Sequence, residues 1–169
     1  MVTVISFYTK DWRYSEYASK MRKDCDLLKI DNVIEELPST GSYLKNTCLK
    51  PRFILDKLKQ LKSPVLWVDV DAKIMKRPDI FCIDDFDKRY DFAAKKMSEK
   101  RSRTWHVGTI YCNYTPAMIQ FLEEWIKNTG EISDESALEF TWQNNKESLR
   151  TTDIPNEYFF IQRLGFGVP

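Results

Sequence analysis

A short apolar run in the middle of the chain, followed at once by two aspartates, constrains the fold more than any other feature. Val65 to Val68 reads Val-Leu-Trp-Val, and Asp69 and Asp71 come directly after it, separated by one valine. A strand with one face in water alternates polar and apolar residues, so an unbroken apolar run predicts a strand covered on both faces. Helices on both sides of a mainly parallel sheet give that cover, so the run favours an α/β domain.

The segments ahead of this run predict two strand–helix pairs. Residues 2–8 are β-branched and aromatic and predict a first strand, and residues 32–37 predict a second. Residues 11–28 and 49–61 carry apolar residues at helical spacing, and Pro51 falls in the first turn of the second helix, where it is tolerated. The order β-α-β-α-β predicts a mainly parallel sheet in the first half of the chain.

The second half of the chain predicts a mixture of strands and helices. We expect strands at residues 91–94, 105–113 and 158–164, and helices at residues 116–126 and 134–142, the last with Ser133 as its N-cap. No repeat or low-complexity segment divides the sequence. A chain of 169 residues has the length of one domain, so we expect residues 1–169 to form a single unit.

Composition limits the classes of partner and the compartment. Lys and Arg number 26 against 25 Asp and Glu, a net charge of +1, which gives no sign of a nucleic-acid or membrane surface. No apolar stretch approaches the roughly 20 residues of a membrane span, and the N-terminus lacks a signal-peptide pattern. The four cysteines have no CxxC spacing, so we expect free thiols and a soluble, cytoplasmic protein.

The two aspartates predict a site for a divalent cation. Ligands of open α/β sheets gather outside the carboxyl ends of the strands, which is where Asp69 and Asp71 are expected. Mg²⁺ and Mn²⁺ prefer carboxylate oxygens, and Mg²⁺ is usually held by one or two carboxylates together with substrate phosphates. An isolated Asp-x-Asp is usually a solvated surface pair, so its flanking sequence decides how it is interpreted.

The flanks resemble one enzyme class. Residues 50–79, which contain Lys-Pro-Arg-Phe-Ile and Asp-Val-Asp-Ala, resemble the core of the GT-A-fold, DxD-containing nucleotide-sugar glycosyltransferases. The turn at residues 41–47, the strand at residues 106–113 with Gly108 and Thr109, and the acidic helix start at residues 133–142 are similar to further parts of the same pattern. The likeness covers roughly residues 2–145 and is strongest to small viral and bacterial members.

The resemblance implies a Rossmann-like, mixed but mainly parallel sheet flanked by helices, forming one GT-A domain. It further implies a metal-dependent hexosyltransferase that takes a sugar from a nucleoside-diphosphate sugar, with a uridine diphosphate sugar as the expected donor. The implied acceptor is a glycan or a protein, and a modified nucleic-acid base stays open. The implied cofactor is Mn²⁺ or Mg²⁺.

The resemblance also assigns roles to the donor-binding residues. Ser6, Tyr8 and Thr9 would cradle the nucleoside, and Tyr8 or Tyr14 would stack on its base. Trp12, Tyr14 and Tyr17 are, however, more typical of core aromatics than of residues that stack on a base.

The phosphates and the metal would be held by residues around the acidic motif. Lys50 or Arg52 would reach the phosphates, although Lys50 could also merely cover the surface of its helix. Asp69 would meet the ribose and the metal, and Asp71 the metal directly.

The acceptor side would be formed by residues of the second half. Gly108 and Thr109 would flank the sugar and the acceptor, since a small residue permits close approach. Asp134 or Glu135 would contact the sugar or act as general base, a role that typically contributes about 10²–10⁴-fold to the rate. Both acids could instead be present because carboxylates stabilise a helix N-terminus.

The chain departs from the family pattern at the metal. Many relatives take a third ligand from a histidine near the C-terminus, whereas this chain has a single histidine, His106, in the middle. Asp153 and Glu157 are possible substitutes. Two carboxylates without a histidine predict a metal held largely by the donor phosphates and by water.

Two other functions fit the sequence less well. A haloacid-dehalogenase-like phosphohydrolase also places Asp-x-Asp after a strand, but after its first strand and with Thr or Val where this chain has Lys73. A non-catalytic nucleotide-sugar-binding domain is compatible with the short chain and the missing histidine.

Overall fold

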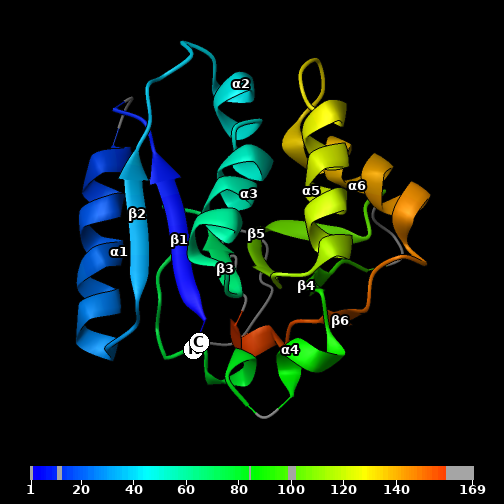
Figure 1. The fold of residues 1–169 in the computed structure, drawn as a ribbon. Helices are drawn as coiled ribbons and strands as arrows, with labels where there is room; N and C mark the ends of the chain where they lie inside the picture. The colour runs from blue at the N-terminus through cyan, green and yellow to red at the C-terminus, as the bar shows by residue number, and fades with distance from the viewer. Residues whose placement is uncertain (1, 11–12, 84, 99–101, 159–169) are drawn as a thin grey trace.

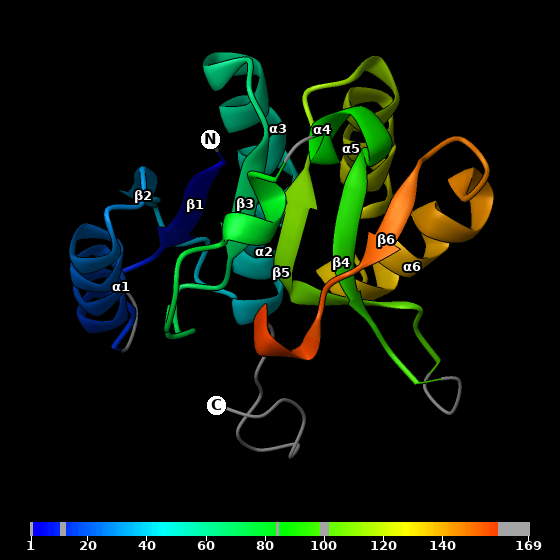
Figure 2. The same cartoon turned by 90° about the horizontal axis from the view of Figure 1, so that it is seen from below.

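A six-stranded sheet organises the chain, with the strand order β2-β1-β3-β5-β4-β6 (Figure 1, Figure 2). The computed structural model describes residues 2–10, 13–83, 85–98 and 102–158. The strands are β1 (Thr3–Tyr8), β2 (Asn32–Glu36), β3 (Val65–Val68), β4 (Phe92–Lys96), β5 (Trp105–Cys112) and β6 (Thr151–Asp153).

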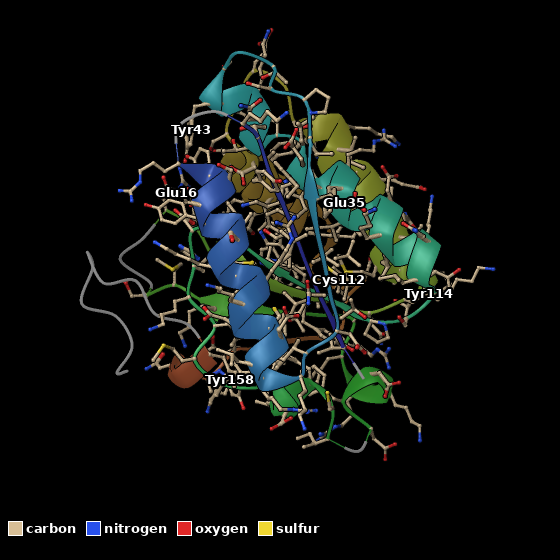
Figure 3. All side chains as sticks on the ribbon, turned by 90° about the vertical axis from the view of Figure 1, so that its left-hand side faces the viewer. Glu16, Glu35, Tyr43, Cys112, Tyr114 and Tyr158 are labelled. Atoms are coloured by element: carbon tan, nitrogen blue, oxygen red, sulfur yellow. The ribbon has the colours of Figure 1, made fainter. Side chains whose placement is uncertain are left out.

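Helices lie on both sides of this sheet and at its edges. The α-helices are α1 (Tyr14–Leu28), α2 (Tyr43–Thr47), α3 (Lys50–Leu61), α4 (Phe86–Arg89), α5 (Pro116–Asn128) and α6 (Asp134–Asn145), and the 3-10 turns are η1 (Asp79–Phe81) and η2 (Asn156–Tyr158). Figure 3 shows α1 lying in front of β1 and β2 on one side of the sheet, whereas α3, α5 and α6 pack on the other.

The sheet is parallel in its first half and mixed in its second. β1 pairs in parallel with both β2 and β3, as the β-α-β-α-β order predicts. β5 runs antiparallel to its two neighbours β3 and β4, and β6 returns parallel to β4. The predicted mixed, mainly parallel sheet flanked by helices is therefore confirmed. Since β3 and β5 are antiparallel, the carboxyl end of β3 lies beside the first half of β5.

Strand β3 is buried on both faces, which explains its unbroken apolar sequence. Val65 and Trp67 enter the core beneath α3, α5 and α6, and Leu66 and Val68 enter the core beneath α1 and η1. All four side chains are less than 9% exposed. Side chains on both faces of β3 are therefore removed from water when the chain folds, and a polar side chain there would need a hydrogen-bond partner.

The predicted elements match the observed ones closely wherever a segment is long and periodic. The predicted helix at 49–61 is α3, whose Phe53, Ile54 and Leu58 are buried as expected, and Ser133 caps α6 by accepting a hydrogen bond from the backbone N–H of Ser136. Among the described residues, no helix has both the length and the apolar character needed to cross a bilayer. None of the four cysteines is in a disulfide.

The predicted strand at 158–164 is wrong at its described residue. Tyr158 ends the 3-10 turn η2, and residues 159–164 lie outside the described residues. The last strand is instead β6, which the sequence did not predict because three residues, Thr-Thr-Asp, carry too little pattern. The short helices α2 and α4 were also not predicted, for the same reason.

The packing of the core predicts that two leucines, Leu58 and Leu27, contribute very differently to the stability of the fold. Leu58→Ala removes a completely buried side chain of α3 and should lower the free energy of unfolding by about 2–5 kcal/mol. Leu27→Ala on α1, where the side chain is 81% exposed, should change it by less than about 0.5 kcal/mol. Urea unfolding of both variants tests this, and equal losses would contradict the described packing.

Candidate functional site

The ends of four elements meet at one edge of the sheet and bring the charged residues together. β3 ends at Val68 immediately before Asp69, and the first residues of α3 and α6 are Lys50 and Asp134. β5 supplies Gly108, whose carbonyl accepts the backbone N–H of Asp69 at 2.8 Å. This edge holds the carboxyl ends of the parallel strands, where an α/β sheet binds its ligands.

The ammonium group of Lys50 is the centre of this arrangement. Its Nζ lies 3.1 Å from Oδ1 of Asp69 and 2.8 Å from Oδ2 of Asp134, and it donates to the carbonyl of Val107 at 3.2 Å. Lys50 is only 4% exposed, and its Nζ also lies 5.4 Å from the ring centre of Trp67. One buried cation therefore joins α3, β3, β5 and α6.

The charges around Lys50 decide its protonation. Burial alone would lower the pKa of this lysine, because a low-dielectric surrounding disfavours the charged form. The carboxylates of Asp69 and Asp134 outweigh that effect and hold the pKa of Lys50 above its ordinary value of 10.5. The side chain is therefore a fixed positive charge at neutral pH.

Asp69 is held by its side chain as well as its backbone. Its Oδ1 accepts the indole N–H of Trp67 at 2.9 Å in addition to the ammonium of Lys50. Its carbonyl accepts the backbone N–H of Ala72 at 2.9 Å, which turns the chain after the strand. The carboxylate keeps 36% of its surface exposed and can meet a ligand.

Gly108 leaves a space that the ring of His106 occupies. A Cβ at this position would stand 2.7 Å from Cε1 of His106 and 3.3 Å from Oδ2 of Asp69. The backbone N–H of Gly108 donates to Nδ1 of His106 at 3.0 Å, so the proton of the neutral ring is on Nε2. Burial lowers the pKa of His106, with Asp69 opposing the effect, so the ring is neutral at pH 7.

Asp71 and two tyrosines occupy the exposed side of the same region. Asp71 is exposed, and Tyr14 begins α1 close enough to it for their charges to interact. Burial raises the pKa of Tyr14, and Tyr43, Asp71 and Asp69 raise it further. Tyr43, labelled in Figure 3, is 75% exposed at the start of α2. The structure thus brings Tyr14 to the acidic motif and adds Tyr43, which the sequence did not single out.

The structure separates Lys50 from Arg52. Arg52 is exposed on the far side of α3, where it interacts with Glu123 of α5. The spacing of residues along the helix predicts this difference. Lys50 lies three residues before the buried Phe53 and four before the buried Ile54, so it is on the same face as they are, whereas Arg52 is not on that face.

The predicted nucleoside-binding residues Ser6, Tyr8 and Thr9 lie in the second half of β1 and directly after it. Ser6 is completely buried, and among the described residues its Oγ has no hydrogen-bond partner. Thr9 is 4% exposed, and Tyr8 is half-buried, with the guanidinium of Arg22 5.5 Å from its ring centre. Thr109 is half-buried on β5 opposite Val68. The side chain of Ser6 therefore faces the interior, and Trp12 lies outside the described residues.

The two acidic residues at the start of α6 have different surroundings. Asp134 is buried against Lys50, and its carbonyl accepts the indole N–H of Trp125 at 3.0 Å. Glu135 is 32% exposed and pairs with Arg103, from the connection between β4 and β5.

The residues at the acidic motif fit a cation that binds together with a nucleotide. Within the described part of the chain, no three acidic, histidine or cysteine side chains gather closely enough to hold a metal ion by themselves. Asp153, predicted as a possible third ligand, bonds to the ammonium of Lys95 at 2.7 Å, and the side chain of Glu157 is outside the described residues. Two carboxylates, Asp69 and Asp71, leave the remaining positions to phosphates and water, the usual coordination of Mg²⁺.

Comparison with known proteins bears on the fold. No protein-family model matches the sequence, and a comparison with curated proteins finds no match either. Among solved structures, the chain is similar to a glycosyltransferase involved in glycosylation of the major capsid of PBCV-1, with a TM-score of 0.68, 11% identity, and coverage of 90% of this chain and 81% of that one.

Two further solved structures extend the likeness. The glycosyltransferase GlyE of Streptococcus pneumoniae TIGR4 aligns with a TM-score of 0.54 and 15% identity over 94% of this chain, which spans 46% of GlyE. The galactosyltransferase LgtC, solved with donor and acceptor sugar analogs, aligns with a TM-score of 0.51 and 10% identity over 92% of this chain and 74% of LgtC.

The chain has the GT-A fold.

Within this GT-A domain, sequence reasoning missed Trp67. A usable signal was present, because residues i and i+2 of an extended chain point to the same side, which places the indole of Trp67 beside Asp69. Trp67 was assigned only to the core. Its N–H is nevertheless the donor that completes the environment of Asp69 Oδ1.

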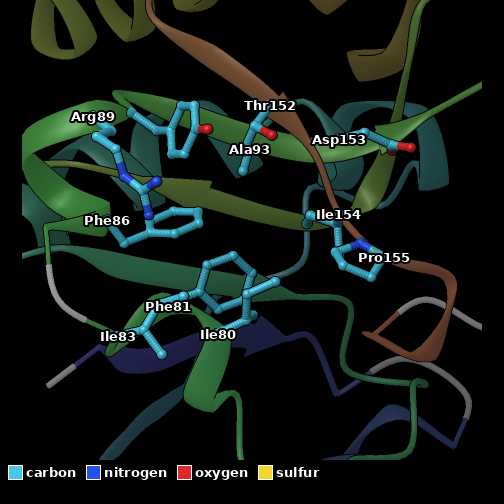
Figure 4. A pocket seen from close by; sticks show the side chains of 11 residues that line it. Ile80, Phe81, Ile83, Phe86, Arg89, Ala93, Thr152, Asp153, Ile154 and Pro155 are labelled. Atoms are coloured by element: carbon cyan, nitrogen blue, oxygen red, sulfur yellow. The ribbon is translucent and has the colours of Figure 1, made fainter.

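A separate cavity of about 260 Å³ lies away from this site, between η1, α4, strand β4 and the edge strand β6 (Figure 4). Phe81, Phe86, Ile154 and Pro155 form its apolar lining, and Arg89 and Asp153 lie on its wall. Apart from Asp153, which the sequence offered as a possible third metal ligand, none of the predicted catalytic, donor-binding or metal residues lines it.

Replacing Lys50 should destabilise the fold far more than replacing another lysine of α3. Lys50→Met leaves two carboxylates without their buried cation and should lower the free energy of unfolding by about 3–5 kcal/mol at pH 7. The matched control Lys59→Met, whose half-exposed side chain pairs with Glu123, should leave stability almost unchanged.

The Lys50 contribution should depend on pH in one direction. Because the pKa of Lys50 is higher in the folded protein, its stabilisation is complete below pH 10.5 and is lost as the pH rises through the folded-state pKa. Urea unfolding of wild type and Lys50→Met from pH 7 to pH 11 should show the difference narrowing only above pH 10.5. A difference that is small at pH 7 would contradict the buried ion pairs.

Proposed function

We propose that this protein is a metal-dependent glycosyltransferase that takes its sugar from a nucleoside-diphosphate sugar, with a uridine diphosphate sugar as the donor. The observation that carries the proposal is the cluster of Lys50, Asp69 and Asp134 at the carboxyl edge of a GT-A sheet. The fold alone does not give an activity, since one fold hosts many functions. The cluster supplies the charges that binding and cleaving a sugar diphosphate require.

The two aspartates and the lysine would bind a cation and a diphosphate together. Asp69 and Asp71 would hold Mn²⁺ or Mg²⁺, which when bound neutralises charge on the departing nucleoside diphosphate. Lys50 is a fixed positive charge paired with Asp69, so it holds that carboxylate in place. We assign Lys50, and not the exposed Arg52, to the phosphate side of the site.

The nucleoside would lie beside the end of β1. Tyr8, Thr9 and Tyr14 would contact it there, and Tyr14 lies close enough to Asp69 and Asp71 for their charges to raise its pKa. Ser6 is completely buried and would support the strand end from within. Tyr14 is a stronger candidate than Tyr8 for stacking on the base, because it lies closer to the acidic motif. Stacking of a base on an aromatic side chain is worth about 1–3 kcal/mol in nucleic-acid complexes.

The sugar and the acceptor would lie toward β5 and α6. Asp134 shares an ammonium with Asp69, so we assign it to the reacting end of the donor. Gly108 and Thr109 border the same region from β5, and Glu135 lies next to Asp134 but faces Arg103. A glycan or protein hydroxyl is the proposed acceptor, and a nucleic-acid base is the remaining alternative.

A phosphohydrolase of the haloacid dehalogenase type is less compatible with the molecule. That class needs Asp-x-Asp after its first strand, whereas here β1 and β2 precede β3, and the structural neighbours have the GT-A fold. A non-catalytic nucleotide-sugar-binding domain shares the proposed donor site and differs only in turnover.

Nucleotide binding should require a divalent cation and both aspartates. Calorimetry with UDP and GDP, with and without Mn²⁺, should show binding that needs Mn²⁺ and is lost in Asp71→Ala and Asp69→Asn. Asp69→Asn keeps an oxygen for Trp67 and Lys50 but removes the negative charge. Asp56→Asn, at an exposed position of α3, is the control and should bind as wild type does. Cation-independent binding of equal strength in Asp71→Ala would remove the metal assignment.

Turnover should depend on Asp134 more than on Glu135. Slow release of free sugar from a UDP-sugar should fall by at least about 10²-fold in Asp134→Asn, within the range for losing a positioned carboxylate, and by less than about 10-fold in Glu135→Gln. Sugar release measured by chromatography tests both. The reverse order would exchange the two roles, and no turnover by wild type with any donor that it binds would favour the binding domain.

A further inference from the structure

The carboxylate of Asp69 is held in an asymmetric way. The indole Nε1–H of Trp67 and the ammonium of Lys50 both reach the same oxygen, Oδ1, at 2.9 and 3.1 Å. Oδ2 lies instead on the side of Gly108, 3.3 Å from where a Cβ of that residue would be. Since both donors to Oδ1 come from buried side chains, Oδ2 is the oxygen left for a ligand.

The indole of Trp67 is in a position to fix this orientation. Its side chain is 2% exposed and packs against the rings of Phe7 and Phe53, with centroid distances of 5.3 and 6.0 Å. A large ring packed at interior density cannot change rotamer without displacing its neighbours. The direction of its N–H is therefore set by the core beneath α3, before any ligand binds.

A second tryptophan provides a natural contrast. Trp105 is 5% exposed on β5 and packs against Phe92 and Trp142 in the same core. Its indole Nε1–H has no hydrogen-bond partner among the described residues. Replacing either tryptophan by phenylalanine removes one indole N–H and part of one buried ring, but only the change at Trp67 removes a donor to Asp69.

We propose that Trp67 is a positioning residue of the donor site, which commits Oδ1 of Asp69 to the protein so that Oδ2 alone is presented to the divalent cation. The inference rests on the proposed function, because it concerns how the cation of that function is held. Partners that orient a metal-binding side chain typically change metal affinity by about 10–100-fold when they are removed. The orientation of a single carboxylate matters most at a site where the protein offers only two carboxylates to the cation.

A metal titration in the presence of nucleotide tests the proposal without measuring activity. Wild type, Trp67→Phe and Trp105→Phe are titrated with Mn²⁺ at a fixed concentration of UDP, or of GDP where wild type prefers it, and the melting temperature is followed. The half-saturating Mn²⁺ concentration should rise by about 10–100-fold in Trp67→Phe and stay within about 2-fold of wild type in Trp105→Phe. The melting temperatures without metal or nucleotide report the packing loss of each variant separately.

A measurement on the wild-type protein tests the proposal even if Trp67→Phe does not fold. In ¹⁵N-labelled wild type, the indole N–H signals of the tryptophans are followed while Mg²⁺ and the nucleotide are added. The signal of Trp67, identified by its absence from Trp67→Phe or by selective labelling, should shift markedly, and that of Trp105 should shift little. A Trp67 signal that stays in place while other signals move would overturn the proposal.

The outcomes separate this inference from the function on which it rests. If wild type and Trp105→Phe respond to Mn²⁺ and Trp67→Phe responds at the same concentration, the positioning role is wrong and the donor site stands. If both variants weaken equally, Trp67 acts only through packing, and the inference is again overturned. If wild type shows no cation-dependent response to either nucleotide, the proposed function fails and the inference falls with it.

Discussion

The buried ammonium of Lys50 is the interaction on which the rest of the site depends. A charged group at 4% exposure is unfavourable unless opposite charges and hydrogen-bond acceptors surround it. Asp69, Asp134 and the carbonyl of Val107 meet that requirement together, and each comes from a different element. The end of β3, the start of α6 and the first half of β5 must therefore converge on the start of α3, so the reacting edge is assembled by the same contacts that stabilise the fold.

This arrangement divides the carboxylate oxygens between the protein and a ligand. Oδ2 of Asp134 and Oδ1 of Asp69 meet the ammonium of Lys50, whereas Asp71 is exposed and Oδ2 of Asp69 lies on the side of Gly108. A site with so few protein ligands depends on the phosphates of a nucleotide to complete the coordination of an ion. The neutral ring of His106 lies against Gly108 near this edge, and its Nδ1 already accepts a backbone N–H. His106 therefore affects the shape of the site and adds no charge to it.

How much was predictable depended on how long and how periodic each segment is. β3 was predicted to the residue because four consecutive apolar side chains directly after the helix-breaking Ser63-Pro64 favour a strand covered on both faces. α3 was predicted from its apolar residues at helical spacing, and α6 from its N-cap. β6, α2 and α4 were missed because three to five residues do not establish a period; tertiary pairing with β4 creates β6. The predicted strand at 158–164 failed at Tyr158, where aromatic character reflected packing against Phe81 and not an extended chain.

The sequence by itself determined that an acidic pair would follow a doubly buried strand in an α/β domain, because local apolar pattern reports burial directly. It also contained the choice between Lys50 and Arg52, since two residues on an α-helix are separated by roughly 200° and only Lys50 shares the buried face. Only the tertiary structure decided that Lys50 would meet Asp134, which begins a helix in the other half of the chain, and that Trp67 would direct its N–H at Asp69. Such contacts depend on how elements dock and how rings pack, and no local pattern encodes either.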